Sequence, residues 1–243
     1  MAVGPFTNAL VVYGEFDISG DLNTVQVDEK ADMLERTVFG DTTRRFQAGL
    51  RAVEVAGSGF VDFDTTTTPP GMEGGLFAEI GAAQKNLSFA PAAVDGSVAY
   101  VTKGVSDSFA WNLTPSELGK FDWAVKGNRQ LGRGHLLQAP TNETATLTTA
   151  IQETGATLVT QSMVCNLHVI EFDGTSLDVV VYSNDTNDEV TPTAVATFAQ
   201  ATGLTSEQIV DAGAVTDTYW YAVLTFTGTS FKAAVAIGIT DNA

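Results

Sequence analysis

The sequence has few of the residues on which enzyme active sites and disulfide frameworks depend. It contains one cysteine, Cys165, so no disulfide can form within the chain, and we interpret this cysteine as a small core residue. It contains two histidines. His168 lies within an expected strand and is interpreted as structural, and His135 lies in a basic loop without a nearby Cys, Asp or Glu. Neither a nucleophile elbow nor a phosphate-binding glycine loop occurs. We expect a protein that is not an enzyme and needs no cofactor.

Basic residues are also scarce. Against 29 Asp and Glu there are 12 Lys and Arg, which gives a formal net charge of −17 and excludes the cationic surface that nucleic-acid binding needs. Residues 1–140 hold 11 bases and 17 acids, whereas residues 141–243 hold one base, Lys232, and 12 acids. This shift predicts two domains. We place them at residues 1–138 and 146–243, joined by a linker at 139–145, and expect limited proteolysis to cut near Ala139–Thr144.

Long apolar runs are absent. None reaches the ~18 residues of a membrane span, and the N-terminal Met-Ala-Val-Gly-Pro lacks the basic and apolar regions of a secretory signal. We expect a protein that is made in a cytoplasm and has no membrane partner.

What the sequence does contain is the alternation typical of strands. The clearest example is a long strand from Leu50 to Phe63. The residues expected to face the core are Val53, Val55, Val61 and Phe63, and those expected on the opposite face are Glu54, Ala56, Ser58 and Asp62. Phe60 is the exception, which a bulge at Gly57 or Gly59 could re-aim. Glycines here also let a second backbone come close.

The remaining pattern predicts a mainly β chain. In the first half we expect strands at 22–27, 97–102, 105–113 and 121–126, a long polar loop at Asp28–Gly49 and one short helix at Gly75–Lys85. In the second half we expect strands at 163–172, 176–183, 194–198, 218–226 and 230–239, turns at Asp173–Thr175 and Thr227–Thr229, and a helical turn at Ser206–Ala212. In the second half, the short and evenly spaced strands predict a β-sandwich or jelly roll.

Two stretches of the second half invite binding hypotheses. The acidic run Asp185–Glu189 offers oxygen ligands for a hard cation, but it lacks the glycine and distal glutamate of an EF-hand, so we interpret it as a solvated turn and predict no metal site. Tyr219, Trp220 and Tyr221 suggest sugar stacking. Neighbours on a strand point to opposite faces, so at least one of the three belongs to the core.

Several segments carry a family resemblance by their order and spacing. They are Asp17–Gly20, Leu22–Val25, Ala31–Glu35, Thr37–Thr42, Phe46–Leu50 and a long strand ending in Gly59–Asp62. With them, the N-terminal half resembles the tail tube (major tail) proteins of long-tailed, non-contractile phages of the siphovirus type. The stretches His168–Thr175 and Tyr219–Ile239 are similar to the outer β-sandwich that some of these proteins carry.

The resemblance implies a structural virion protein of the tail tube, made in the host cytoplasm. It also implies that the N-terminal domain is a β-sandwich or barrel with one short flanking helix, followed by the outer β-sandwich. Six copies would close into a ring whose inner sheets form one barrel. Rings would stack around the tape-measure protein, between a tail terminator and a baseplate, and double-stranded DNA would later pass through without specific binding. The implied subunit and ring contacts are Thr37, Phe39, Gly40, Asp41, Thr42, Arg44 and Arg45, and the implied lumen residues are Glu54, Ser58 and Asp62.

Rings of Glu54 and Asp62 carboxylates would then repel DNA near the wall. Two other readings stay open. One is a β-sandwich module that binds carbohydrate or a surface, and the other is a different ring component of the virion, such as a tail terminator or a baseplate hub.

Overall fold

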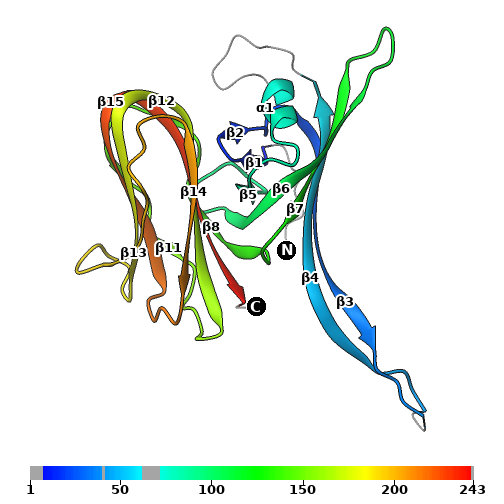
Figure 1. The fold of residues 1–243 in the computed structure, drawn as a ribbon. Coiled ribbons are helices and arrows are strands. Elements are labelled where there is room, and N and C mark those ends of the chain that lie inside the picture. The colour runs from blue at the N-terminus through cyan, green and yellow to red at the C-terminus, as the bar shows by residue number, and fades with distance from the viewer. Residues whose placement is uncertain (1–7, 40–41, 62–71, 242–243) are drawn as a thin grey trace.

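The fold is built almost entirely of antiparallel strands. The computed structural model describes residues 8–39, 42–61 and 72–241, in which fifteen strands form one branched sheet and a single short helix, α1 (Met72–Ala78), lies beside them (Figure 1). The strands are β1 (Leu10–Tyr13), β2 (Phe16–Asp17), β3 (Leu22–Glu35), β4 (Phe46–Phe60), β5 (Lys85–Ala90), β6 (Val98–Asn112), β7 (Lys120–Gly127), β8 (Gly132–Gln138), β9 (Asn142–Glu143), β10 (Leu147–Thr148), β11 (Gln152–Glu153), β12 (Gln161–Asn184), β13 (Thr193–Thr197), β14 (Thr205–Ala212) and β15 (Tyr219–Asp241). The expected mainly β class with one short helix is confirmed. The helix lies earlier in the chain than the expected Gly75–Lys85.

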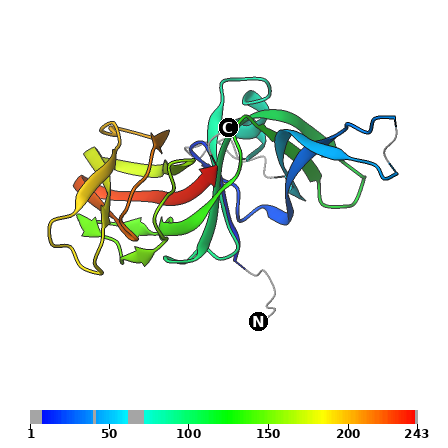
Figure 2. The same ribbon diagram turned by 90° about the horizontal axis from the view of Figure 1, so that it is seen from below.

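A long hairpin of β3 and β4 dominates the N-terminal part. The two strands pair from Leu22 opposite Gly59 to Glu35 opposite Phe46, but only the Val53–Phe60 section of β4 also pairs with β7. The other half of the hairpin projects away from the body (Figure 1 and Figure 2). The expectation of a loop at Asp28–Gly49 is therefore wrong at both ends. Solvent surrounds both faces of this section, so its sequence lacks the apolar alternation by which a half-buried strand is detected.

The inner face of the sheet β3-β4-β7-β6 packs on a core of its own. Val53 and Val55 are buried there, and Val61 packs against the same cluster, as expected. The cluster is completed by Val11, Tyr13, Phe16, Ile18, Leu76, Leu87, Phe121, Trp123 and Val125. Gly59 allows the expected close approach: a Cβ there would overlap the carbonyl oxygen of Asp21, which accepts a hydrogen bond from the Phe60 amide at 3.0 Å.

The C-terminal part is one long hairpin that bends over on itself. β12 and β15 pair along nearly their whole length, and both arch over together at one end of the sandwich (Figure 1). The expected turns at Asp173–Thr175 and Thr227–Thr229 are wrong, because the chain continues through both as strand. The register shifts near Gly174, which lies opposite Gly228, and bulges of this kind bend a strand pair without ending it.

The bend places both halves of the pair around one core. Leu167 and Val169 from the first half of β12 belong to the same buried cluster as Leu177 and Val179 from its second half. Two further expectations also fail. Residues 205–212 form strand β14 on the edge of β12 instead of a helical turn, and the strands expected at 97–102 and 105–113 are one continuous strand, β6.

A second core is shared by the two parts of the chain. It contains Leu10, Val12, Ala90, Ala99, Val101, Leu136 and Ala139 from the first part and Val164, Ile170, Ala234 and Ala236 from the second. β8 pairs with both β6 and β15, so backbone hydrogen bonds cross between the parts. Lys232, the single base of the second part, lies 3.6 Å from Asp17 of the first. The division into residues 1–138 and 146–243 stays a prediction, and any such units are packed closely on one another.

Candidate assembly surfaces

The outer face of the sheet β3-β4-β7-β6 is polar. Glu54 and Ser58, two of the expected lumen residues, lie on it, while the third, Asp62, falls outside the described residues. Residues opposite one another in the register share a face. The charged residues found on it in this way are Asp28, Lys30, Glu54, Lys120, Asp122 and Lys126, with Asp107 beside them at a bulge in β6.

The charges on this polar face nearly balance. Among the described residues three lysines accompany four carboxylates. Lys126 Nζ lies 2.6 Å from Glu54 Oε2 and 4.0 Å from Asp107 Oδ2, and Lys30 Nζ lies 2.9 Å from Asp28 Oδ2. Each Glu54 carboxylate is therefore paired with a lysine of the neighbouring strand, and the ring of Glu54 carboxylates stays a prediction.

Phe60 also lies on the polar face, half exposed at the end of β4. A bulge at Gly57 or Gly59 does not re-aim it, because β4 runs in unbroken register with β7 from Val53 to Phe60. The irregularity is on the partner strand, where β3 shifts between Leu22 and Thr24.

Both edges of the sheet are open among the described strands. β3 pairs only with β4. On the other edge, β6 pairs with β7 from Gly104 to Asn112, while β5 covers its far side only as far as Gly104, followed by a single bridge at Ser106. The section Asp107–Asn112 therefore presents an unpaired edge. Open edges of this length are sites at which another chain can add a strand.

The tip of the β3–β4 hairpin is apolar and basic. The hairpin exposes Met33, Leu34, Val38, Phe39, Phe46 and Leu50, with Leu50 83% exposed. Of the expected contact residues, Thr37, Phe39, Thr42, Arg44 and Arg45 are exposed here, and Gly40 and Asp41 fall outside the described residues. The Arg45 amide donates to Thr37 Oγ1 at 3.1 Å, and the Arg36 amide donates to the Arg45 carbonyl at 2.9 Å. The structure brings these residues together at one point, far from the core.

The opposite end of the same sheet carries a second apolar cluster that sequence reasoning missed. It consists of Phe60, Phe77, Ile80, Trp111, Leu113 and Leu118, all at least partly exposed. Phe77 of α1 stacks on Trp111 of β6 with ring centroids 6.0 Å apart. No periodicity in the sequence could have found the cluster, because its members come from four separate segments that only the tertiary fold brings together. Sixteen large apolar residues are exposed in the described chain, and twelve of them lie at these two ends of the sheet.

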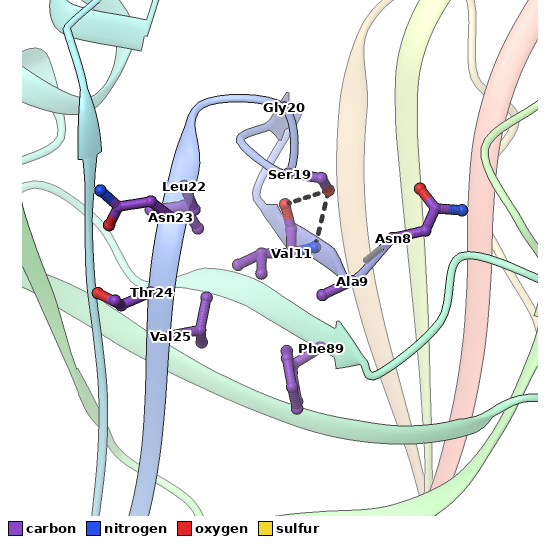
Figure 3. Close-up of a pocket in the computed structure, with 10 residues that line it drawn as sticks. All are labelled: Asn8, Ala9, Val11, Ser19, Gly20, Leu22, Asn23, Thr24, Val25 and Phe89. Carbon is purple, nitrogen blue, oxygen red and sulfur yellow. Dashed lines mark hydrogen bonds between the residues drawn. The ribbon is translucent and has the colours of Figure 1, made fainter. Parts of the chain in front are cut away.

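A pocket of about 600 Å³ opens beside the first residues of β3. Its walls are formed by Asn8, Ala9, Val11, Ser19, Gly20, Leu22, Asn23, Thr24, Val25 and Phe89 (Figure 3). The Ser19 hydroxyl is already occupied, because it lies 2.8 Å from the Val11 amide and 2.6 Å from Asp17 Oδ1. None of the described residues that line the pocket has a titratable side chain.

The second part of the chain offers little binding chemistry. Trp220 is fully buried and its indole donates to the Gly155 carbonyl at 3.3 Å, while Tyr221 is nearly buried and stacks on Tyr182. This confirms that at least one of the three aromatics belongs to the core. In the Asp185–Glu189 loop, Asp188 Oδ1 accepts hydrogen bonds from Asn184 and from the Val190 amide. Across the described ranges no group of three His, Cys, Asp or Glu residues is arranged to hold a metal ion.

The remaining candidates for chemistry are structural. Cys165 and His168 are buried in β12, as expected, and burial raises the pKa of the Cys165 thiol to about 12. His135 lies 3.2 Å from the Thr154 hydroxyl, and burial together with Arg133 lowers its pKa. In the described part of the chain, none of the helical structure has the length and apolar character of a membrane span.

Comparison with known proteins gives structural likenesses only. No family model matches the sequence, and no curated protein matches it. The chain is similar to a chain from the virion of a native gene transfer agent particle, with a TM-score of 0.41 and 14% identity over 54% of this chain and 98% of that one. It is similar to the SPP1 Dit protein, described as a hub of the adsorption apparatus in phages that infect Gram-positive bacteria, with a TM-score of 0.42 and 14% identity over 94% and 98%. A chain from the C6-symmetric tail of an empty gene transfer agent particle gives 0.41 and 13% over 53% and 97%. Scores this low assign the chain to no family.

Proposed function

We propose that this chain is a structural virion protein of a phage tail. Its copies join side to side into closed rings, and the rings stack into the tail tube through which DNA leaves the particle. One observation carries the proposal: the sheet β3-β4-β7-β6 has two open edges among the described strands, one apolar face and one polar face with nearly balanced charge. The resemblance of residues 17–62 to tail tube proteins supports the same function from the sequence.

The strand directions support ring closure. All neighbours in the sheet are antiparallel and each copy contributes four strands, so the first and last strands run in opposite directions. When the open edge of β6 in one copy lies beside β3 of the next, the new pair is therefore antiparallel as well. This contact is heterologous, since different surfaces of the two copies meet, and a closed ring of such contacts leaves no open edge. The family resemblance implies six copies.

The polar face of the sheet is proposed to line the lumen, with Glu54 and Ser58 on the wall. Its balanced charges offer passing DNA no net attraction, because binding to phosphates requires an excess of Lys and Arg. Along the tube axis, the hairpin tip would reach the adjacent ring. Thr37, Phe39, Thr42, Arg44 and Arg45 are its proposed contacts. The exposed apolar side chains at the other end of the sheet, Phe77, Ile80, Leu113 and Leu118, form the surface that would receive it. The tape-measure, terminator and baseplate proteins are the further partners.

Imaging the purified protein tests this function. Mass photometry would first give the number of copies per particle, and negative-stain electron microscopy would then show their arrangement. We expect rings that stack into tubes as the concentration rises. Single rings that never stack would instead favour a terminator or baseplate hub. Monomers at all concentrations would overturn ring formation and leave the surface-binding module as the better hypothesis.

A further inference from the structure

The pocket beside β3 is lined by apolar side chains, Val11, Leu22, Val25 and Phe89, and by polar ones, Asn8, Ser19, Asn23 and Thr24. In Figure 3 the side chains of Val11, Val25 and Phe89 approach one another across it, and β3 forms one wall. Leu22 and Val25 are only half-buried, although both pack against the core of the N-terminal part. None of the described residues that line the pocket is charged, and the apolar members of the lining suit an apolar or aromatic occupant.

The open edge of β6 carries aromatic residues of the right kind. Phe109 and Trp111 point to the apolar side of the sheet, where Phe109 stacks on Phe121 at 5.5 Å between centroids. Trp111 remains 46% exposed even though it stacks on Phe77. An indole that is half exposed at an unpaired strand edge is an unfilled contact surface.

The register of the sheet places these two surfaces at the same height. One row across the four strands consists of paired residues: Val25 of β3, Gly57 of β4, Trp123 of β7 and Phe109 of β6. The next row on the same face of the sheet consists of Leu22, Gly59, Phe121 and Trp111. A second copy whose β6 edge pairs with β3 without stagger therefore brings Phe109 level with Val25 and Trp111 level with Leu22. Both pairs lie on the apolar side of the sheet, so the faces match as well as the heights.

We propose that the pocket beside β3 is an intersubunit site, and that its occupant is the Phe109–Trp111 edge of β6 from a second copy of this chain. The inference rests on the proposed ring and names the residues that form the contact between neighbouring copies in it. The apolar side chains of the pocket then continue the core of one copy into that of the next, while the polar faces of the two sheets join on the other side.

Cross-linking between copies tests the site. Protein with Val25→Cys is mixed with protein with Trp111→Cys before assembly and treated with a short bis-maleimide, so that only a link between copies can form. The control replaces Trp111→Cys by Val190→Cys, which is 67% exposed but belongs to the loop after β12. The native Cys165 is buried and gives the background. We expect covalent dimers from the Val25 and Trp111 pair and only background from the control.

The outcomes distinguish a failure of the proposed intersubunit site from a failure of the proposed ring. Rings without the specific cross-link would overturn the site and leave the proposed function intact, whereas a failure of unmodified protein to form rings would overturn both. Should a cysteine variant not fold, Val25→Arg gives an independent test. With its folding checked by a cooperative melting transition, we expect this variant to raise the concentration needed for ring assembly about tenfold or more, because a charge would enter an apolar contact. Assembly equal to that of wild type and of Val190→Arg would overturn the site.

Discussion

Ser88 on β5 and His168 on β12 meet inside the protein, with the serine Oγ 2.8 Å from the imidazole Nε2. The other ring nitrogen, Nδ1, lies 2.6 Å from the carbonyl oxygen of Gly14. A carbonyl can only accept, so Nδ1 carries the proton and Nε2 accepts a hydrogen bond from the serine hydroxyl. Beside this pair, Asn166 donates to the Leu87 carbonyl at 3.1 Å. The neutral histidine thus joins the two parts of the chain through a fully buried network.

This arrangement predicts that the stability contributed by the buried His168 is lost at acidic pH. Burial lowers the pKa of His168 to about 4 from an ordinary value of 6.5, although the nearby Glu15 and Asp17 act in the opposite direction. The unfolded chain therefore takes up this proton at higher pH than the folded one. The stabilisation is fully present above pH 6.5 and is lost as the pH falls towards 4. At about 1.4 kcal/mol per pKa unit, the loss is roughly 3 kcal/mol.

Calorimetric melting of wild type and His168→Gln between pH 7 and pH 4 measures this loss. The variant should be less stable at pH 7 and should lose less stability on acidification, since the carboxylates titrate in both proteins. Parallel pH profiles would show that His168 is not the group responsible.

A second prediction concerns the bend of the C-terminal hairpin. A Cβ on Gly228 would lie 2.3 Å from the Gly174 Cα and 2.7 Å from the Asp173 carbonyl oxygen. Both are backbone atoms that cannot move aside, so we expect Gly228→Ala to lower the free energy of unfolding by about 1–3 kcal/mol. Gly203 has open space around it and provides the control, with Gly203→Ala expected to stay within about 0.5 kcal/mol of wild type. Urea titrations of both variants give the comparison, and equal effects would contradict the packing argument.

A third prediction concerns charge on the proposed lumen wall. Glu54→Lys removes the partner of Lys126 and makes the polar face net positive. We expect particles carrying it to eject DNA more slowly, most clearly at low salt, because charge acts over about 10 Å at 0.1 M salt. Lys126→Glu changes the same ion pair in the opposite direction and serves as the control, with no slowing expected. Ejection followed by DNA dye fluorescence at two salt concentrations decides the matter. Equal rates for both variants would show that charge at this position does not affect passage.

The hairpin tip gives a fourth prediction. Phe39 is fully exposed, so Phe39→Asp should leave the free energy of unfolding within about 0.5 kcal/mol of wild type. Tube growth should nevertheless be lost, because a carboxylate would have to be buried in the contact between rings. Val190→Asp, at an exposed site on the outer sandwich, should affect neither property. Sedimentation measures tube growth and melting measures stability on the same samples. Normal tubes from Phe39→Asp would show that the hairpin tip does not form the proposed contact between rings.

The shared core gives a fifth prediction, on truncation. Removing residues 145–243 takes away β15, the partner of β8, and uncovers Leu10, Val101 and Leu136 in the shared core. Exposing apolar side chains costs about 1.5–3 kcal/mol for each large one. We therefore expect residues 1–144 to melt far below the full chain and to bind a hydrophobic dye. A truncated protein that melts cooperatively and forms rings would show that the first part is an independent unit.

The sequence by itself determined the class of fold, the inward residues Val53 and Val55, and the structural roles of Cys165 and His168. These follow from local chemistry, since alternation fixes which face of a strand is apolar and a lone cysteine cannot form a disulfide. The segments that resemble tail tube proteins also pointed to the hairpin tip, although its distal strands were taken for a loop. Backbone pairing in solvent leaves no pattern in the side chains, so that section could not be recognised as strand.

Only the tertiary structure decided the rest. The glycines near 174 and 228 indicated turns locally, but pairing of β12 with β15 along their length converts them into a bend between two layers. Lys126 neutralises Glu54 because β7 lies next to β4, and the Trp111 cluster exists because α1 and β6 meet beside the sheet. Each of these features depends on contacts between residues far apart in the chain, and the spacing of residues along one segment contains no information about such contacts.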